Sequence, residues 1–424
     1  MQLKRFLFIL LVFLNLTHAW SQNIDKVYDS LIHTVLVHPL GNPLGIPVVA
    51  LGENNPLSIS FDDFSNQYQE YYYSVELVDK NGQSVPMDPA DYVTGFNQQK
   101  ITGYKPSSVA AQSYFHYQFN YPNENAHPKV SGNFKLSVYK NANKNNLVFT
   151  KRFYVVDPQV NVLATVEEPF DGNISKTHQH LKVKVDISKV PYFQTDQLQI
   201  SVWQNYLYND AQTIISPNFI RGDMLEYNNE EQLIFPAGKE ARWLDLQSLR
   251  LRSDRMESIE SLQNYTLVKA KPDISRASIA YYNFKDLNGA FVISNSESLE
   301  ADVQNDYAKV VFTYLPSEKA PFIGQKLYLV SSFTNNELGK EAEMIFDPKQ
   351  GVYQKMILLK QGYYSYNYML RDKEVPNYKD DFTETEGNHW ETENNYTVMV
   401  YYRAPGTRYD QIIGFITLNS KQNW

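Results

Sequence analysis

Alternation of apolar and polar residues is the dominant pattern along this chain. It is clearest between residues 180 and 187, where every second position is apolar: Leu181, Val183, Val185 and Ile187. Successive side chains on a β-strand point to opposite faces, so this segment predicts a strand with one face in a core and one in water. Similar runs cover residues 114–121, 134–138, 198–203, 310–315, 327–333, 363–370, 396–402 and 412–418.

Strands at this density, separated by polar turns, predict an all-β fold of tandem immunoglobulin-like antiparallel β-sandwiches. Breaks at Asp157-Pro158 and in the polar stretch 294–306 divide the chain into three predicted sandwich domains, residues 22–156, 157–300 and 301–424. Between residues 244 and 262 the apolar positions come closer to helical spacing, although the phase is broken. We expect either a helix or an irregular connection there.

The first 21 residues predict a signal peptide. Lys4 and Arg5 supply its positive end, and the apolar run 6–14 is far shorter than the roughly 20 residues that span a bilayer. Ala19-Trp-Ser21 fits a small-x-small cleavage site, so the mature chain is expected to begin near Gln22 and to be exported. The chain has no cysteine, which excludes disulfides and a lipid anchor on an N-terminal cysteine.

Composition supports this picture. At about 100 to 200 residues per domain, the 424 residues suffice for two to four domains, and 43% of them are hydrophobic. The 32 Tyr and 23 Phe suit the pleated surface of a sheet. Without Lys4 and Arg5, 37 of the 39 basic side chains remain against 47 acidic ones. Such a surface predicts no nucleic-acid partner, because phosphate binding needs clustered Lys and Arg.

A metal site is the first chemistry to weigh. His178 and His180 lie two residues apart, so on a strand both rings would face one side and could bind zinc with a third ligand from a neighbouring strand. The sequence has no HExxH helix, cysteine pair or acidic calcium loop beside them. We therefore prefer a solvent-facing histidine pair and predict no metal and no cofactor.

Catalytic signatures are also missing. The chain contains neither a G-x-S-x-G elbow nor a phosphate-binding glycine loop. A glycosidase needs two carboxylates at a fixed separation, which sequence does not reveal. The candidates gather near the C-terminus: Glu384, Glu386, Glu391 and Glu393. A solvated acidic loop is the simpler interpretation, and we predict that the protein is not an enzyme.

Trp390 stands in a stretch of acidic and amide residues. Exposed aromatic residues on β-sandwiches stack on sugar rings or anchor protein interfaces, which makes Asn388, His389 and Trp390 candidate partner-binding residues. In the alternative interpretation Trp390 folds back over the sandwich edge, while Asn388 and Glu391 hydrogen-bond to the loop backbone.

A second candidate docking edge lies in the first predicted domain. Tyr92 and Phe96 flank Gly95, and Gly103-Tyr104 follows shortly after. Tyr92 and Phe96 are therefore further candidate partner-binding residues. The alternative is that the glycines simply provide turns with a positive φ angle.

Two groups of segments resemble one known family. The first group is Tyr92-Val-Thr-Gly-Phe96, Tyr114-Phe-His-Tyr117, Phe119-Asn-Tyr-Pro-Asn-Glu124, Ser131-Gly-Asn-Phe134 and Lys151-Arg-Phe-Tyr-Val-Val156. The second is Gly387-Asn-His-Trp-Glu-Thr-Glu-Asn394, then Asn395-Tyr-Thr-Val-Met-Val-Tyr-Tyr-Arg403 and Arg408-Tyr-Asp-Gln-Ile-Ile-Gly-Phe415. From about residue 30 to its end, the chain resembles the plug protein family of the type IX secretion system of the Bacteroidetes.

This resemblance implies a periplasmic subunit on the inner side of the outer membrane. Its expected partner is the giant outer-membrane translocon β-barrel, whose periplasmic opening it would seal by bulk, without a membrane span or lipid anchor of its own. A reversible seal suits an interface of roughly 1,200 to 2,000 Å². The alternatives are a carbohydrate-binding β-sandwich module with Trp390 as its stacking platform, an outer-membrane barrel formed by the chain itself and, last, an enzyme.

Overall fold

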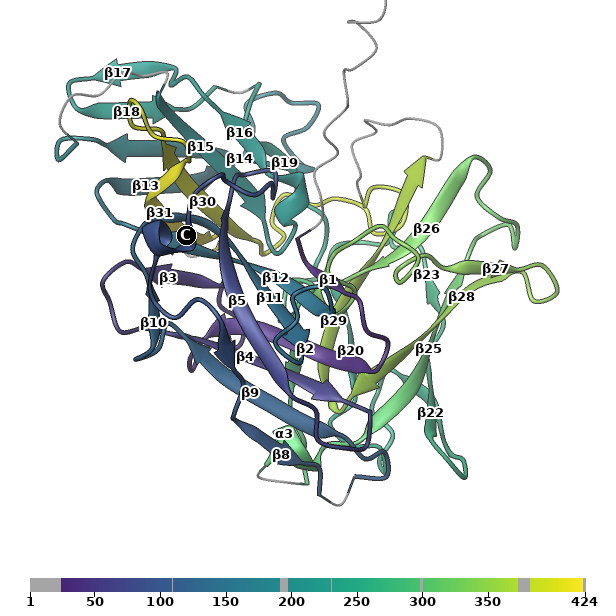
Figure 1. Cartoon of the computed structure of the whole chain (residues 1–424). Helices are drawn as coiled ribbons and strands as arrows, with labels where there is room; N and C mark the ends of the chain where they lie inside the picture. The colour runs from purple at the N-terminus through teal and green to yellow at the C-terminus, as the bar shows by residue number, and fades with distance from the viewer. Residues whose placement is uncertain are drawn as a thin grey trace, which may run out of the picture.

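The computed structural model describes residues 24–108, 110–190, 197–229, 231–297, 300–372 and 382–421. The predicted signal peptide lies outside the described residues. Strands form nearly all the regular structure, and they assemble into three units that each contain two main sheets (Figure 1). The predicted all-β class of antiparallel β-sandwiches is confirmed.

The first unit consists of strands β1 to β12. One sheet has the order β1-β12-β11-β5-β7, with β3 parallel to β12, and the facing sheet has the order β2-β4-β9-β8. β6 and β10 form a separate two-stranded ribbon. The elements are β1 Lys26–Val27, β2 Ile32–Pro39, β3 Val48–Ala50, β4 Leu57–Asp63, β5 Tyr71–Val78, α2 Pro89–Tyr92, β6 Val93–Gly95, β7 Gln99–Lys100, β8 Tyr104–Pro106, β9 Phe115–Tyr121, β10 Ala126–Pro128, β11 Gly132–Lys140 and β12 Leu147–Val156.

The second unit combines strands β13 to β19 with the last two strands of the chain. Its sheets have the orders β13-β14-β18-β17, with β19 pairing β14, and β16-β15-β30-β31. The elements are β13 Asn161–Glu167, β14 His178–Asp186, β15 Leu198–Gln204, η3 Tyr208–Asp210, β16 Gln212–Ile214, β17 Phe219–Arg221, β18 Met224–Tyr227, β19 Ile234–Pro236, β30 Asn395–Tyr402 and β31 Gln411–Asn419.

The third unit consists of strands β20 to β29. Its sheets have the orders β20-β29-β24, with β26 pairing β29, and β21-β22-β25-β28-β27, with β23 pairing β25. The elements are β20 Arg242–Asp245, β21 Met256–Ser261, β22 Thr266–Ala270, β23 Asp273–Ile274, β24 Phe291–Ile293, α3 Ala301–Gln304, β25 Tyr307–Leu315, β26 Gln325–Val330, η4 Ser332–Thr334, β27 Ile345–Asp347, β28 Val352–Lys360 and β29 Gly362–Asp372.

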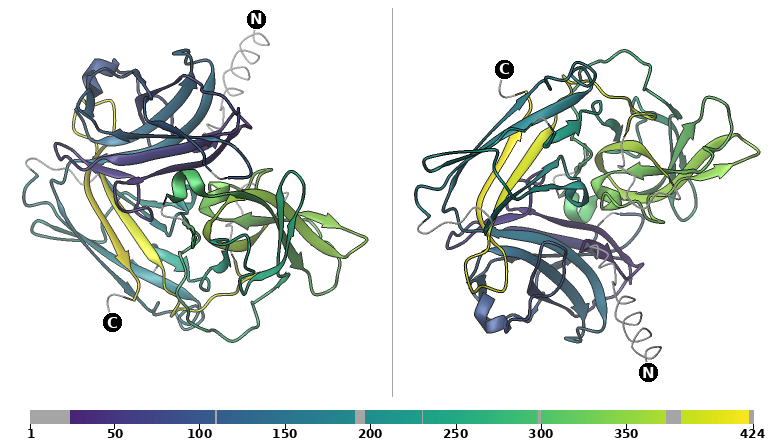
Figure 2. Two further views of the ribbon diagram at one scale, coloured as in Figure 1. Left: turned by 90° about the horizontal axis from the view of Figure 1, so that it is seen from below. Right: turned by 90° about the horizontal axis from the view of Figure 1, so that it is seen from above.

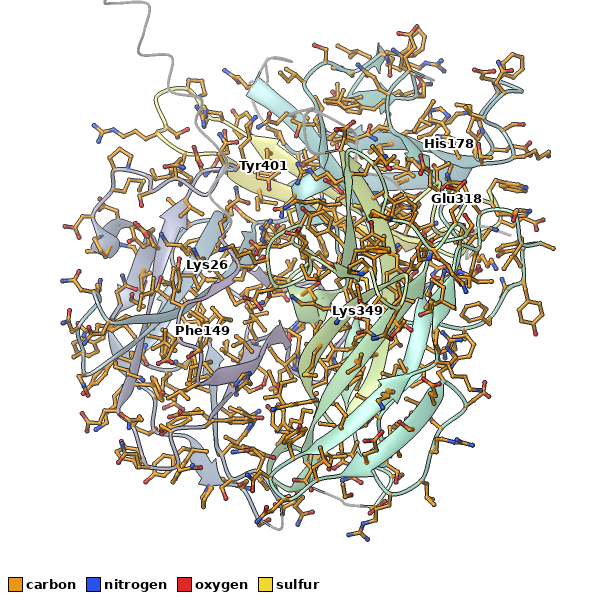
Figure 3. The ribbon with its side chains drawn as sticks, turned by 90° about the vertical axis from the view of Figure 1, so that its right-hand side faces the viewer. Lys26, Phe149, His178, Glu318, Lys349 and Tyr401 are labelled. Carbon is orange, nitrogen blue, oxygen red and sulfur yellow. The ribbon has the colours of Figure 1, made fainter. Side chains whose placement is uncertain are left out.

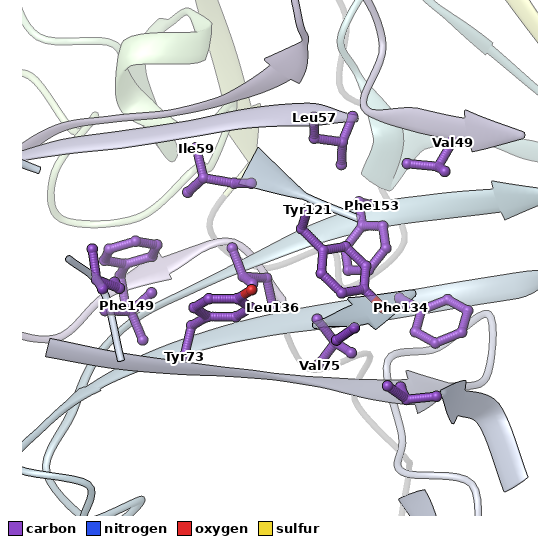
Figure 4. Packing of buried hydrophobic residues seen from close by; sticks show 14 of the residues in the cluster. Val49, Leu57, Ile59, Tyr73, Val75, Tyr121, Phe134, Leu136, Phe149 and Phe153 are labelled. Carbon is purple, nitrogen blue, oxygen red and sulfur yellow. The ribbon is translucent and has the colours of Figure 1, made fainter. Parts of the chain in front are cut away.

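Each unit has its own apolar core between its sheets, as the alternating runs predict. In the first unit, Tyr121 from β9 packs on Phe153 from β12 with ring centroids 5.5 Å apart, and Figure 4 shows both rings between the two sheets. In the second unit, Leu181, Val183 and Val185 of β14 are fully buried. Aromatic rings bury large areas, so the many Tyr and Phe residues contribute much of the core.

The grouping of strands into units differs from the predicted division of the chain into three consecutive domains. β30 pairs with β15, for example Leu198 with Tyr402, so the C-terminal strands complete the second unit (Figure 2). The predicted boundary at residues 300 and 301 falls inside the third unit, between β24 and β25. Alternation reveals a strand but not its partner, because pairing between residues about 200 positions apart leaves no local signal.

The structure decides two further expectations. The 244–262 segment is no helix: β20 ends at Asp245, β21 begins at Met256, and turns connect them, in agreement with the alternative of an irregular connection. The 114–121 run predicts one wet strand face, but His116 on that face is buried, because Lys360 of the third unit packs against Asp62, the partner of His116.

Buried contacts join the three units. Tyr154 of β12 stacks on Trp203 of β15, and the Tyr401 hydroxyl donates a hydrogen bond of 2.9 Å to Asn133 Oδ1 between the first and second units. Figure 3 shows Tyr401 on β30, close to the first unit. Between the second and third units, Leu207 packs against a small cluster that includes Met369. The units are therefore joined by packed, buried side chains as well as by the connecting chain.

A buried ion pair fixes the first unit to the third. Lys360 Nζ of β28 lies 2.6 Å from Asp62 Oδ2 of β4, and both side chains are 1% exposed. The Tyr307 hydroxyl donates to the same Asp62 oxygen at 2.6 Å, and His116 Nδ1 lies 2.6 Å from Asp62 Oδ1. Burial alone would raise the pKa of Asp62, but Lys360 and His116 outweigh it and lower the pKa.

Candidate functional site

Residues 382–394, the described part of the connection between β29 and β30, are held in place by a buried carboxylate. Glu386 accepts hydrogen bonds from Arg242 Nε at 3.0 Å, from Arg276 Nε at 2.7 Å and from the Tyr368 backbone at 2.9 Å. Arg242 also donates to Asp273 at 2.8 Å. Burial would raise the pKa of Glu386, but the two guanidinium groups outweigh it and lower the pKa. The carboxylate therefore acts as a charged anchor.

A strap, residues 275–284 between β23 and β24, lies against this loop. The Arg276 backbone N–H donates to Thr385 O at 2.8 Å, and Ser275 Oγ donates to Glu384 O at 2.7 Å. Gly387 has a φ of +78°, and a Cβ there would lie 2.9 Å from Ala277 Cα. Only glycine allows this approach without displacing the strap.

The Trp390 segment is fixed to the second unit by its backbone. Asn388 Oδ1 accepts from Gly238 N at 2.8 Å, and the His389 N–H donates to Gly238 O at 2.8 Å. Gln179 Nε2 donates to Trp390 O at 2.6 Å. The Asn388 contact agrees with the interpretation that this loop folds back on the sandwich edge. The same interpretation expected the Glu391 side chain to bond to the loop backbone, but this side chain is exposed.

Aromatic side chains gather where the strap meets the loop. The His389 ring stacks on Tyr281 with centroids 4.0 Å apart and planes 1° apart. Tyr281 and Trp390 also line a largely apolar pocket of about 320 Å³. Beside it, Tyr282 is 76% exposed and Ile279 is about half exposed. We call the strap and the Trp390 loop together the strap surface. It presents apolar side chains on a backbone that is hydrogen-bonded to its surroundings.

The structure separates the two predicted candidates of the first unit. Phe96 is 74% exposed at the end of β6, and its N–H donates to Asn125 O. Tyr92 is only 4% exposed and packs edge-to-face on Phe134 inside the core. The Tyr92 side chain therefore supports the fold and is not available to a partner. Gly95 has a φ of +86°, and a Cβ there would overlap Asn125 O, so its role is to provide a turn.

The predicted histidine pair does not face solvent as expected. His180 is 1% exposed and His178 is half-buried. Among the residues that the structure describes, no three His, Cys, Asp or Glu side chains are grouped so that they could hold a metal ion.

Sequence reasoning missed Arg242, Arg276, Tyr281 and Glu240. The Tyr281 hydroxyl donates to Glu240 Oε1 at 2.6 Å and reaches Glu391 O at 2.8 Å. All four residues precede the Trp390 loop by about 100 positions or more, and the strap has no alternation that would mark it. Arg242 is placed by the pairing of β20 with β29, which no local pattern reveals.

A carboxyl group near the strap titrates close to neutral pH. Burial, with smaller contributions from the neighbouring carboxylates Glu393 and Glu240, raises the pKa of Asp286 to about 7, against the lowering effect of hydrogen bonds from the Ala241 and Asn288 backbones. Between the ordinary value of 3.8 and about 7, the folded chain holds a proton that the unfolded chain has released. The stability that this proton provides is therefore lost as pH rises toward 7.

We expect the free energy of unfolding to fall with rising pH in this window, by at most about 1.4 kcal/mol per pH unit for one proton. Asp286→Asn should flatten the slope, leaving a smaller contribution from Glu393, whose pKa burial also raises. Urea unfolding between pH 5 and 8 measures this. The control is Asp254→Asn at an exposed site. Equal slopes in the parent protein and Asp286→Asn would contradict the assignment.

Taken together, the fold and the strap surface define a β-protein of three sandwich units with exposed apolar side chains at the strap. Residues 32–157 match a family model described as "Type 9 secretion system plug protein 1st domain". A crystal structure of a hypothetical protein from Parabacteroides merdae ATCC 43184 superposes with a TM-score of 0.88 at 30% identity, covering 93% of this chain and 99% of that chain. The chain belongs to the type IX secretion system plug protein family and is involved in type IX secretion.

Other comparisons add little. A Pseudomonas fluorescens alkylpurine DNA glycosylase bound to DNA is 17% identical over 29% of each chain, and its TM-score of 0.17 carries no argument. No curated protein matches the chain. Among the described residues, no helix combines the length and apolar character needed to cross a membrane.

Proposed function

We propose that this protein is the plug subunit that sits on the periplasmic side of the outer membrane and seals the translocon β-barrel of the type IX system. Membership of the plug protein family supports this role. The mechanism is steric. A pore wide enough for folded cargo would leak solutes when idle, and a broad protein body across its opening prevents this. The proposed role includes no chemical step.

The observation that carries the proposal is that buried contacts join the three units into one body. Units joined only by linkers move relative to one another, whereas large buried interfaces suppress such motion. Here the stacked Tyr154 and Trp203 rings join the first and second units, and the buried Lys360–Asp62 pair joins the first and third. A body whose units are held together by such buried contacts keeps its outline against an opening.

The strap surface is the proposed docking face. Exposed aromatic residues next to a pocket suit protein interfaces, where a few such side chains carry most of the binding energy. Tyr282 and the apolar Ile279 are exposed, half-buried Trp390 lines the pocket, and the charged Glu386 anchor holds the backbone of the loop in place. Preorganisation of this kind reduces the entropy lost on binding.

Affinity purification of the tagged chain from its own cells tests the proposal. We expect a very large outer-membrane barrel to co-purify, and its recovery to fall roughly 10-fold in an Ile279→Asp/Tyr282→Asp double variant, which inserts charge into the docking face. The matched control is Ile323→Asp, at a residue that is 96% exposed in a different loop, and it should retain the barrel.

Recovery of the tagged parent protein without the barrel would contradict the sealing function. Equal recovery with the double variant and the control would contradict only the choice of docking face. Saturable quenching of tryptophan fluorescence by polysaccharide fragments, with no barrel recovered, would instead support the carbohydrate-binding alternative.

A further inference from the structure

A groove of about 610 Å³ lies between the first and third units, lined by residues other than those of the strap surface. One wall comes from β1 and β2 of the first unit, residues 26–35, and the other from η4 and β28 of the third unit. Half-buried Phe291, Phe333 and Ile357, which pack against the core of the third unit, also line it. The groove therefore combines apolar side chains and strand backbone with charged side chains that include Asp29 and Glu337.

One edge of β28 is open along this groove. On its inner side β28 pairs with β25 over its whole length, from Tyr353 to Lys360. On its outer side β27 pairs only with Val352–Gln354. Among the described residues, no strand continues this pairing along Lys355–Lys360, a length of about 20 Å at 3.3 Å per residue.

The register shows which backbone groups face outward. The Gln361 N–H donates to Asp306 O at 2.9 Å, immediately beyond the paired residues Lys360 and Tyr307. Hydrogen-bonded pairs alternate along an antiparallel ladder, so Leu359 and Ile357 direct their N–H and C=O groups toward β25. Met356 and Leu358 consequently direct theirs away from β25, toward the open edge.

The opposite wall is less suited to pairing. β2 is the terminal strand of its sheet, but its ladder with β4 is interrupted between His33 and Leu36, and Thr34 has a φ of 49°. The Thr34 hydroxyl is hydrogen-bonded to the Tyr307 hydroxyl at 2.6 Å, which fixes this irregularity against the third unit. Bulges of this kind protect an edge from strand addition. β28 shows no register irregularity along its ladder with β25.

We propose that this groove binds an extended segment of another polypeptide, which adds to the open edge of β28 as a further strand. The backbone of the segment would pair with Met356 and Leu358, and alternate apolar side chains would cover Phe291 and Phe333. Strand addition obtains its affinity from main-chain hydrogen bonds and its specificity from alternate side chains. Because β1 and β2 close the opposite side, the edge admits a single segment and not the sheet of a second folded copy.

Amide hydrogen exchange tests the open edge directly in the intact protein. Without any ligand, the Met356 and Leu358 amides should exchange about 100-fold faster than those of Ile357 and Leu359, which are bonded to β25. The probe is a pool of capped peptides of about seven residues in which Val or Ile alternates with Thr or Ser. The pool should slow exchange at Met356 and Leu358 roughly 10-fold, and a pool N-methylated on alternate residues should have no effect.

Met356→Pro removes one outward donor, and proline is tolerated on an edge whose N–H faces away from the ladder. We expect this variant to keep the parental melting temperature and to bind the pool roughly 10-fold more weakly, while Met356→Leu binds as the parent does. Slow exchange of both amides in the free protein, no effect of the pool, or unchanged binding by Met356→Pro would each overturn the proposal. A Met356-dependent dimer would overturn it in favour of a second copy. None of these results depends on the proposed sealing function.

Discussion

Replacing Lys360 with methionine is expected to lower the free energy of unfolding by about 3 to 5 kcal/mol, the usual cost of removing one member of a buried ion pair. The variant leaves the Asp62 carboxylate buried between the first and third units without its main counter-charge. Tyr307 and His116 still contact Asp62, but the Tyr307 hydroxyl is neutral and does not compensate a full charge. Urea unfolding followed by circular dichroism gives the measurement.

The controls separate the charge effect from loss of packing. In the Asp62→Asn/Lys360→Met double variant no charge remains to be buried at this pair, so most of the loss should be recovered. Lys135→Met breaks a partly exposed ion pair with Glu76 and should cost less than about 1 kcal/mol. If Lys360→Met destabilised the chain no more than Lys135→Met, the Lys360–Asp62 pair would not hold the two units together.

Strand content could be read from the sequence because alternation is a local signal. Residues 180–187 and 114–121 predict strands, and the structure has β14 and β9 there. The faces were harder to assign. The alternation around His116 indicates one wet face, but the third unit covers it and brings Lys360 to Asp62. A second buried face arises from contacts between units, which no window of ten residues reveals.

The candidate site was located in part. The unusual composition around Trp390 indicates a functional loop, and the structure places this loop beside a pocket. Its supports, Arg242 and Arg276, lie more than 100 residues earlier and carry no motif. Tyr92 shows the opposite difficulty. An aromatic residue beside a glycine turn resembles a docking residue, and only the position of Phe134 shows that it belongs to the core.

Arg242→Met is expected to have an effect as large as that of Lys360→Met, about 3 to 5 kcal/mol, because its guanidinium group forms ion pairs with two buried carboxylates. Arg242 bonds Glu386 and Asp273 together, and Arg276 and Arg255 each provide only one further contact to this pair. Arg242→Lys should recover only part of the loss, since an ammonium group does not reproduce the planar fork that reaches both carboxylates.

The pH dependence distinguishes this charge effect from a simple packing defect. Glu386 has a lowered pKa in the folded chain, so its stabilising contribution is present above its ordinary value of 4.5 and is lost as pH falls below it. Removing Arg242 brings the pKa of Glu386 back toward that value. The difference in unfolding free energy between the parent and Arg242→Met should therefore be largest at pH 7 and shrink at pH 4, as measured by urea unfolding. Lys176→Met, which breaks the exposed pair with Glu168, should show a small difference at both pH values. A difference for Arg242→Met that is the same at both pH values would mean that the arginine acts through packing, and the strap surface would then need another source of rigidity.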